Sequence, residues 1–151
     1  MHLCTGLLER DGRILLVQSR YPNQPAPLWN LPGGRQRPDE LLEAALVREF
    51  LEETGLAVTV GALHYLSESY DLATGTHFLN ATFDVRAEGE ARVPAGDPHA
   101  IGVTWVLRAD LASHLPVAVV REPLLAHLAG DSRRYFAFPD AGITIEFADP
   151  F

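Results

Sequence analysis

The sequence contains one cysteine, Cys4, so an intramolecular disulfide is excluded. It also lacks an apolar run long enough to span a bilayer and an N-terminal secretory signal, so we expect a cytoplasmic protein without a membrane partner. Basic residues are scarce: 12 Lys and Arg stand against 20 Asp and Glu, for a net charge of −8. Because nucleic acids attract clustered Lys and Arg, no nucleic-acid polymer is expected as a partner either.

The chain does have enough apolar residues for one core. Its 151 residues are 47% hydrophobic, which is typical of a single globular domain. No linker, internal repeat or low-complexity tract interrupts it. We therefore predict one domain over residues 1–151.

The residue pattern predicts a mixture of strands and helices. Strands are expected at 3–9, 14–20, 56–60, 63–70, 76–86, 91–93 and 102–107, with one hairpin turn at Asp11-Gly12 and another at 73–75. Helices are expected from Pro38-Asp39-Glu40 to Gly55, at 109–115 and at 119–129, the last two separated by Pro116.

The last part of the chain predicts an additional C-terminal β-hairpin at 134–147. Its two apolar runs, 135–138 and 143–147, flank a turn-forming segment at 139–142. An exposed apolar edge strand is a liability, so one of these runs either pairs with a second subunit in a homodimer or folds over its own sheet. The sequence leaves both alternatives open.

The helix predicted to end at Gly55 has two different faces. At about 100° per residue, its apolar side chains form one arc that we expect to pack on the core: Ala44, Leu46, Val47, Phe50 and Leu51. Glu49, Glu52 and Glu53 fall together on the other side, about one helical turn apart.

Three carboxylates this close repel one another unless water, protons or cations neutralise them. Hard divalent ions such as Mg²⁺ and Mn²⁺ take oxygen ligands of this kind. The alternative is a solvated helix face on which Arg48 pairs with Glu52. The preceding Gly33-Gly34 favours the metal site, because a glycine backbone can approach a pyrophosphate from the side opposite the ions.

The stretch at 34–56 resembles the signature of the Nudix hydrolases, G-x5-E-x7-R-E-U-x-E-E-x-G-U, where U is a bulky aliphatic or aromatic residue. Every fixed position matches: Gly34, Glu40, Arg48, Glu49, Phe50, Glu52, Glu53, Gly55 and Leu56. The resemblance implies an α/β protein with an α/β/α sandwich around a mixed β-sheet. It also implies metal-dependent hydrolysis of a pyrophosphate bond in a nucleoside di- or triphosphate or a nucleoside-diphosphate-linked compound.

The same resemblance assigns roles to the matching residues. It implies that Glu49, Glu52 and Glu53 bind Mg²⁺ or Mn²⁺, with the backbone carbonyl of Gly33 as a further ligand. Arg48 would then orient the glutamates rather than contact substrate. Glu40 would tie the loop to the helix.

The general base is where the sequence departs from the family pattern. Many members carry a glutamate in the loop before the strand that holds Trp105, whereas His99 occupies that position here and Asp97 is the nearest carboxylate. The candidates for the base are therefore His99, Asp97, and Glu52 or Glu53 from the helix itself.

The substrate is less constrained than the reaction. Arg20 and four aromatic residues are candidates to bind it, although aromatic residues on strands also suit a core: Tyr21, Trp29, Tyr70 and Phe78. A small chain favours a compact nucleoside or deoxynucleoside di- or triphosphate, with nucleotide sugars second. A non-catalytic nucleotide sensor of the same fold is the alternative outside the enzymes, and messenger RNA decapping is disfavoured by the acidic charge.

Overall fold

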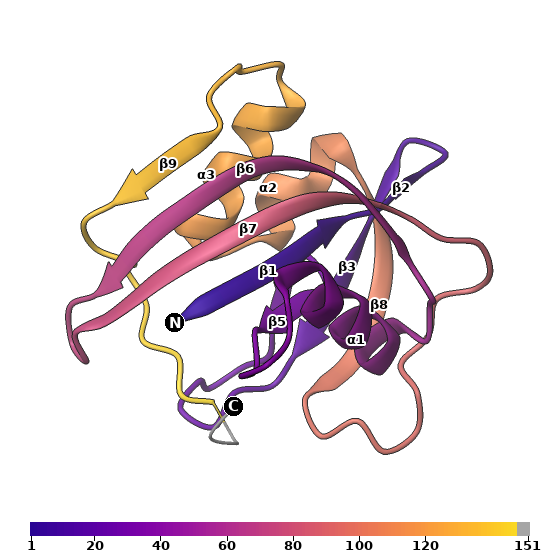
Figure 1. Cartoon of the computed structure of the whole chain (residues 1–151), viewed down its shortest axis with the longest axis horizontal. Coiled ribbons are helices and arrows are strands. Elements are labelled where there is room, and N and C mark those ends of the chain that lie inside the picture. The colour runs from indigo at the N-terminus through magenta and orange to yellow at the C-terminus, as the bar shows by residue number, and fades with distance from the viewer. Residues whose placement is uncertain (148–151) are drawn as a thin grey trace.

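The computed structural model describes residues 1–147 and contains two β-sheets (Figure 1). The five strands of the first sheet lie in the order β5 (Gly33–Arg35), β1 (His2–Leu7), β7 (Thr76–Arg86), β6 (Thr59–Asp71) and β9 (Tyr135–Phe138). It is mixed, because β1 and β7, and also β6 and β9, run parallel, whereas its other pairs are antiparallel. In the second sheet, β3 (Arg13–Ser19) pairs with β8 (Ala100–Leu107), β2 (Glu9–Arg10) and β4 (Leu28–Asn30).

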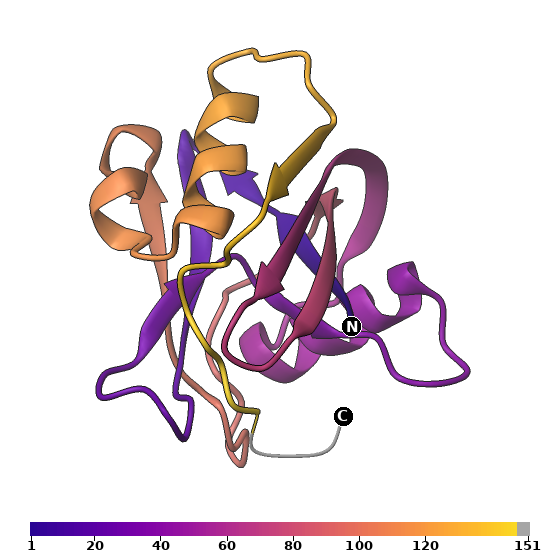
Figure 2. The ribbon, with the colours of Figure 1, turned by 90° about the vertical axis from the view of Figure 1, so that its left-hand side faces the viewer.

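Helices cover the sheets from two sides, as Figure 2 shows. Helix α1 (Leu42–Thr54) packs over a core cluster that includes Leu46 and Phe50. A 3₁₀ turn, η1 (Arg108–Asp110), leads into α2 (Leu111–His114) and α3 (Ala118–Leu128), which cover a second cluster that includes Leu111 and Leu124. The arrangement confirms the predicted α/β/α sandwich around a mixed sheet. No helix within residues 1–147 has the length and hydropathy to cross a membrane.

Several predicted strands differ in the structure. The run at 3–9 was expected to form a hairpin with 14–20, but β1 pairs with β5 and β7, and only β2 continues into the Asp11-Gly12 turn. Residues 56–58 of the predicted run at 56–60 form no strand. The rest of that run and the run at 63–70 belong to one long strand, β6, whose register shifts between Val60 and Tyr65. The strand predicted at 91–93 does not form, because the backbone there does not pair with another strand.

Helix α1 begins at Leu42, later than the predicted start at Pro38-Asp39-Glu40. Asp39 has a φ of 67°, which a right-handed helix cannot include. The end is as predicted, because Gly55 adopts a φ of 72° and its N–H donates to the Leu51 carbonyl at 3.0 Å.

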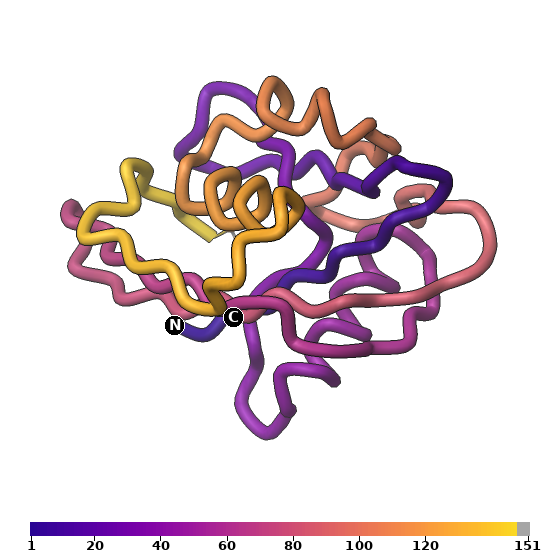
Figure 3. Tube along the Cα trace, turned by 90° about the horizontal axis from the view of Figure 1, so that it is seen from above, coloured from indigo at the N-terminus to yellow at the C-terminus, as the bar shows by residue number. Residues whose placement is uncertain are grey.

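The C-terminal hairpin predicted at 134–147 does not form. Its first half is β9, which extends its own sheet by parallel pairing with β6. Residues 143–147 form no strand, and side chains rather than a neighbouring strand bond their backbone. In Figure 3 this yellow segment passes the tip of the β6–β7 hairpin, where the Ala141 N–H donates to the Tyr70 carbonyl at 2.7 Å. A homodimer stays a prediction.

Candidate active site

The site is built where β5 meets α1, and two glycines make this approach possible. Gly33 has a φ of 155°, and a Cβ there would overlap the Cys4 carbonyl on β1. At Gly34, a Cβ would overlap the carboxylate of Glu49. At position 33 only glycine therefore lets the backbone lie against β1, whereas a side chain at position 34 would displace the Glu49 carboxylate.

Arg48 holds the acidic residues around this backbone in place. Its guanidinium donates to both oxygens of Glu40, at 2.6 and 3.1 Å, and to Glu49 Oε1 at 2.9 Å. It also donates to the Arg35 carbonyl at 3.0 Å and reaches Glu52 Oε2 at 3.5 Å. The structure thus ties β5, the loop before α1 and the helix together through one side chain, consistent with the orienting role expected for Arg48.

Glu53 is buried rather than solvated, with 8% of its surface exposed. The Gly33 N–H donates to its Oε1 at 2.8 Å. Burial raises the pKa of Glu53 well above its usual range, and the charge of Glu49 raises this pKa further. The hydrogen bond from Gly33 lowers the pKa of Glu53, and the charges of Asp97 and Glu52 add smaller increases. Burial likewise raises the pKa of Glu49, against the lowering effect of Arg48.

The predicted division of α1 into an apolar and an acidic face is therefore wrong in part. The buried stripe consists of Ala45, Leu46, Phe50, Glu53 and Thr54. Three residues expected in the core, Ala44, Val47 and Leu51, are exposed. Because the Gly33 N–H donates a hydrogen bond to the Glu53 carboxylate, the buried face of α1 can include this carboxylate in place of further apolar side chains.

The donor set suits a hard divalent cation, which the sequence predicts here. Burial disfavours the charged forms of Glu49 and Glu53, and so does a neighbouring carboxylate in each case: Glu52 for Glu49, and Glu49 for Glu53. A bound cation would relieve both effects. In the described part of the chain, no three His, Cys, Asp or Glu side chains converge as ligands of one ion. Glu52 is the outlying member, with a side chain 43% exposed.

The loop proposed to carry an outside base lies beside the carboxylates. Asp97 is close enough for its charge to raise the pKa of Glu53. Its Oδ1 also accepts the backbone N–H groups of His99 and Ala100, at 2.8 and 2.6 Å, which fixes the start of β8. The His99 carbonyl accepts the Arg20 N–H at 3.0 Å. Asp97 is thus a carboxylate of this loop whose charge reaches Glu53.

A pocket of about 160 Å³ adjoins the same glycines, which line it. It brings together three of the aromatic residues predicted to bind substrate, Tyr21, Trp29 and Phe78. Burial, followed by the charges of Glu53 and Glu49, raises the pKa of Tyr21 to about 12. Tyr21 therefore lies near these carboxylates as well as in the lining of the pocket.

The two other predicted substrate residues lie elsewhere. Tyr70 is 44% exposed and stacks on His77 with ring centroids 4.5 Å apart. Arg20 is exposed at the end of β3 and does not line the pocket.

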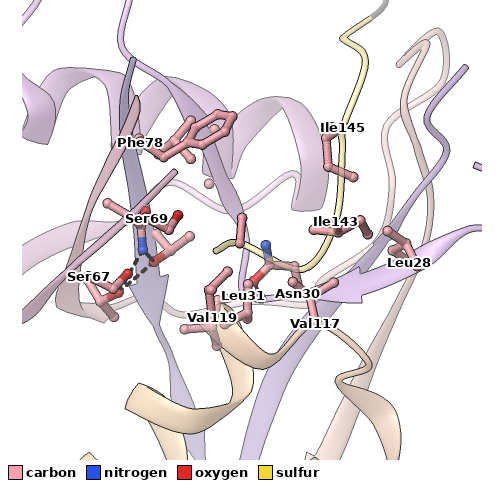
Figure 4. Close-up of a pocket in the computed structure, with 18 of the residues that line it drawn as sticks. Leu28, Asn30, Leu31, Ser67, Ser69, Phe78, Val117, Val119, Ile143 and Ile145 are labelled. Carbon is pink, nitrogen blue, oxygen red and sulfur yellow. Dashed lines mark hydrogen bonds between the residues drawn. The ribbon is translucent and has the colours of Figure 1, made fainter. Parts of the chain in front are cut away.

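Sequence reasoning missed the polar floor of the pocket. Ser67 and Ser69 point from β6 toward it (Figure 4), and both are buried. Beside them, Thr5 and Thr82 share a hydrogen bond of 2.8 Å, and Asn80 Nδ2 donates to both hydroxyls, at 3.1 and 3.3 Å. The available signal was the alternation of serine with larger residues along β6, which places both serines on one face.

Sequence reasoning also missed the contribution of the C-terminal segment. Ile143, Ile145 and Phe147 line the pocket on the side away from the β6–β7 hairpin. Figure 4 shows Phe78 on one side of the opening, Ile143 and Ile145 on the other, and Asn30 between them. The alternation at 143–147 was interpreted as a strand, but it instead turns every second side chain into this pocket.

Comparison with known proteins identifies the family. The NUDIX domain model matches residues 3–128, so the chain belongs to the NUDIX domain family. It is 44% identical over 61 residues to CTP pyrophosphohydrolase of Escherichia coli (strain K12), covering 40% of this chain and 45% of that protein. It is 36% identical over 92 residues to ADP-ribose pyrophosphatase of Methanocaldococcus jannaschii, covering 61% and 53%. The match thus spans about half the length of these curated relatives.

A solved structure supports the same fold. The MutT NUDIX hydrolase from Burkholderia pseudomallei superposes with a TM-score of 0.69 and 34% identity, over 82% of this chain and 94% of that chain. The family and the α/β/α sandwich implied by the signature at 34–56 are therefore confirmed.

Proposed function

We propose that this protein is a single-domain Nudix pyrophosphohydrolase that acts on a nucleoside di- or triphosphate, or on a compound linked through a nucleoside diphosphate. One observation carries the proposal: the Gly33-Gly34 backbone lies between the carboxylates of α1 and an uncharged, aromatic-lined pocket. A molecule with a phosphate chain at one end and a planar base at the other fits both parts. Nucleotides have this form, and nucleotide sugars share it.

The metal proposed is Mg²⁺ or Mn²⁺, held by Glu49, Glu52, Glu53 and the Gly33 carbonyl. Such an ion, when bound, would neutralise phosphoryl charge and lower the pKa of an attacking water. Arg48 supports this arrangement by fixing Glu49 against Gly34. Since burial disfavours the charged form of Glu53, its position also couples metal binding to loss of a proton.

The attacking water must lose a proton, and several side chains of this protein are candidates to accept it. Glu53 and Glu52 lie on α1, and Asp97 or His99 would act from the loop before β8. The nearness of Asp97 to Glu53 supports the loop as a source of the base. Asp97→Asn and His99→Gln separate these alternatives, because replacing the base should lower turnover about 100-fold or more, whereas replacing a residue that is not the base should leave turnover near the wild-type value.

The activity is tested by phosphate release from a panel of nucleotides with Mg²⁺ or Mn²⁺. Glu53→Gln keeps the size of the side chain and removes its charge, so turnover should fall about 100-fold or more. Glu43→Gln is the matched control, because Glu43 lies on the exposed first turn of the same helix, and it should retain full activity.

The panel also distinguishes the alternatives. Preferential cleavage of nucleotide sugars would place the chain closer to the ADP-ribose pyrophosphatase relative in substrate. If wild type and Glu53→Gln are equally inactive on every compound while nucleotide still binds, the protein is a sensor and the proposed activity is wrong.

A further inference from the structure

The C-terminal strap, which we define as residues 141–147, is fastened to parts of the chain far away in sequence. At its start, the Ala141 N–H donates to the Tyr70 carbonyl at 2.7 Å. The Thr144 hydroxyl donates to Asp71 Oδ1 at 3.0 Å, where β6 ends. At its far end, the Arg35 guanidinium lies 4.2 Å from the centroid of the Phe147 ring. The strap therefore bridges the tip of the β6–β7 hairpin and β5.

The loop after β3 supplies the central attachment. Asn23 Nδ2 donates to the Thr144 carbonyl at 2.6 Å, and Asn23 Oδ1 accepts the Glu146 N–H at 2.9 Å. Gln24 Nε2 donates to the same carbonyl at 2.8 Å. The side-chain amide of Asn23 thus replaces the peptide group of a neighbouring strand and holds the strap extended.

In an extended segment, alternate side chains point in opposite directions. Ile143, Ile145 and Phe147 line the pocket, whereas Thr144 bonds away from it. The two isoleucines face Phe78 across the opening (Figure 4). The strap also lies beyond the residues matched by the family model, which end at 128.

We propose that the strap is the specificity wall of the substrate pocket, with Ile145 and Ile143 setting the size of the base that the pocket accepts. This inference depends on the proposed function for the presence of a nucleotide. None of the described side chains that line the pocket is a carboxylate, Lys or Arg, so it suits the uncharged base and not the phosphates. The apolar strap and Phe78 offer surfaces for the faces or edges of the ring, and Ser67 and Ser69 offer hydroxyls for its polar edge.

The strap is tested by changing the volume at Ile145 in both directions. Dissociation constants for purine and pyrimidine nucleoside monophosphates are measured by calorimetry without metal, in a Glu53→Gln background. Ile145→Ala enlarges the pocket, so the ratio of purine to pyrimidine affinity should rise about tenfold. Ile145→Phe fills the pocket, so this ratio should fall by a similar factor. Because nothing is hydrolysed, the result is independent of the proposed activity.

Two further variants test whether the change in the affinity ratio comes from the pocket wall or from any change in the strap. Glu146→Ala changes a strap side chain that is not part of the pocket lining, and it should leave the ratio unchanged. Asn23→Ala removes two hydrogen bonds that hold the strap and changes no side chain of the pocket lining, and it should shift the ratio in the same direction as Ile145→Ala. A ratio that stays within twofold of its starting value in both Ile145 variants, with near-native circular dichroism, would overturn the proposal.

Discussion

Replacing Arg48 by Ala should destabilise the whole protein, not only the site. The guanidinium makes a bidentate pair with Glu40 and bonds Glu49 and the Arg35 carbonyl. The side chains of Arg48, Glu40 and Glu49 are only 19%, 17% and 18% exposed. The variant would thus leave two poorly solvated carboxylates without their cation.

The magnitude follows from this geometry. Breaking a fully buried pair costs about 3–5 kcal/mol, and an exposed pair about 0–1 kcal/mol. At roughly one-fifth exposure the Arg48 network lies between these limits, so we expect a loss of about 2–3 kcal/mol in the free energy of unfolding. For a chain of this size, that lowers Tm by about 4–12 °C. Arg48→Lys keeps the charge but loses the fork, and it should fall between wild type and Arg48→Ala.

Urea denaturation followed by circular dichroism measures the change. Arg108→Ala is the matched control, because Arg108 also makes a bidentate pair with a glutamate, Glu9, but its side chain is 50% exposed. This control should cost less than about 1 kcal/mol. If the two alanine variants lose the same free energy, burial does not govern the strength of these pairs and the reasoning fails.

Two further predictions concern residues around the same backbone. Gly34→Ala places a methyl group on the Glu49 carboxylate and should abolish measurable turnover. The control is Gly102→Ala, whose added Cβ meets only Gln18 at 3.8 Å and which should retain turnover. An active Gly34→Ala would contradict the close approach of Gly34 to Glu49. Cys4 is fully buried, and burial raises the pKa of its thiol to about 12. Native protein should therefore resist alkylation by iodoacetamide at pH 8, whereas urea-unfolded protein should react. Labelling of Cys4 in the native protein would refute this prediction.

The sequence predicted local features of the fold better than contacts between distant segments. Arg48 and Glu52 lie one helical turn apart, so their contact follows from local geometry. The hairpin of β6 and β7 was likewise predictable, because both strands and the turn between them are contiguous in sequence. These features depend on short-range contacts, which periodicity and turn residues encode.

The features that were not predictable depend on contacts across the chain. Burial of Glu53 requires the Gly33 N–H, 20 residues away, to satisfy it. The segment at 143–147 has the alternation of a strand, but Asn23 occupies the place of a pairing partner. Periodicity identifies which side chains share a direction, and it does not identify what bonds the backbone between them.

The depth of α1 in the fold sets the position of its carboxylates, and a residue outside the signature helps to determine it. Gly6 on β1 lies directly under the ring of Phe50, and a Cβ there would lie close to Cε2 of that ring and to both methyl groups of Val85. Phe50 is fully buried and stands between Glu49 and Glu53 in the helix. A side chain at position 6 would therefore require a shift of the neighbouring atoms, and Phe50 belongs to the helix that carries both carboxylates. The geometry of the candidate site therefore depends on the packing of β1 as well as on the motif.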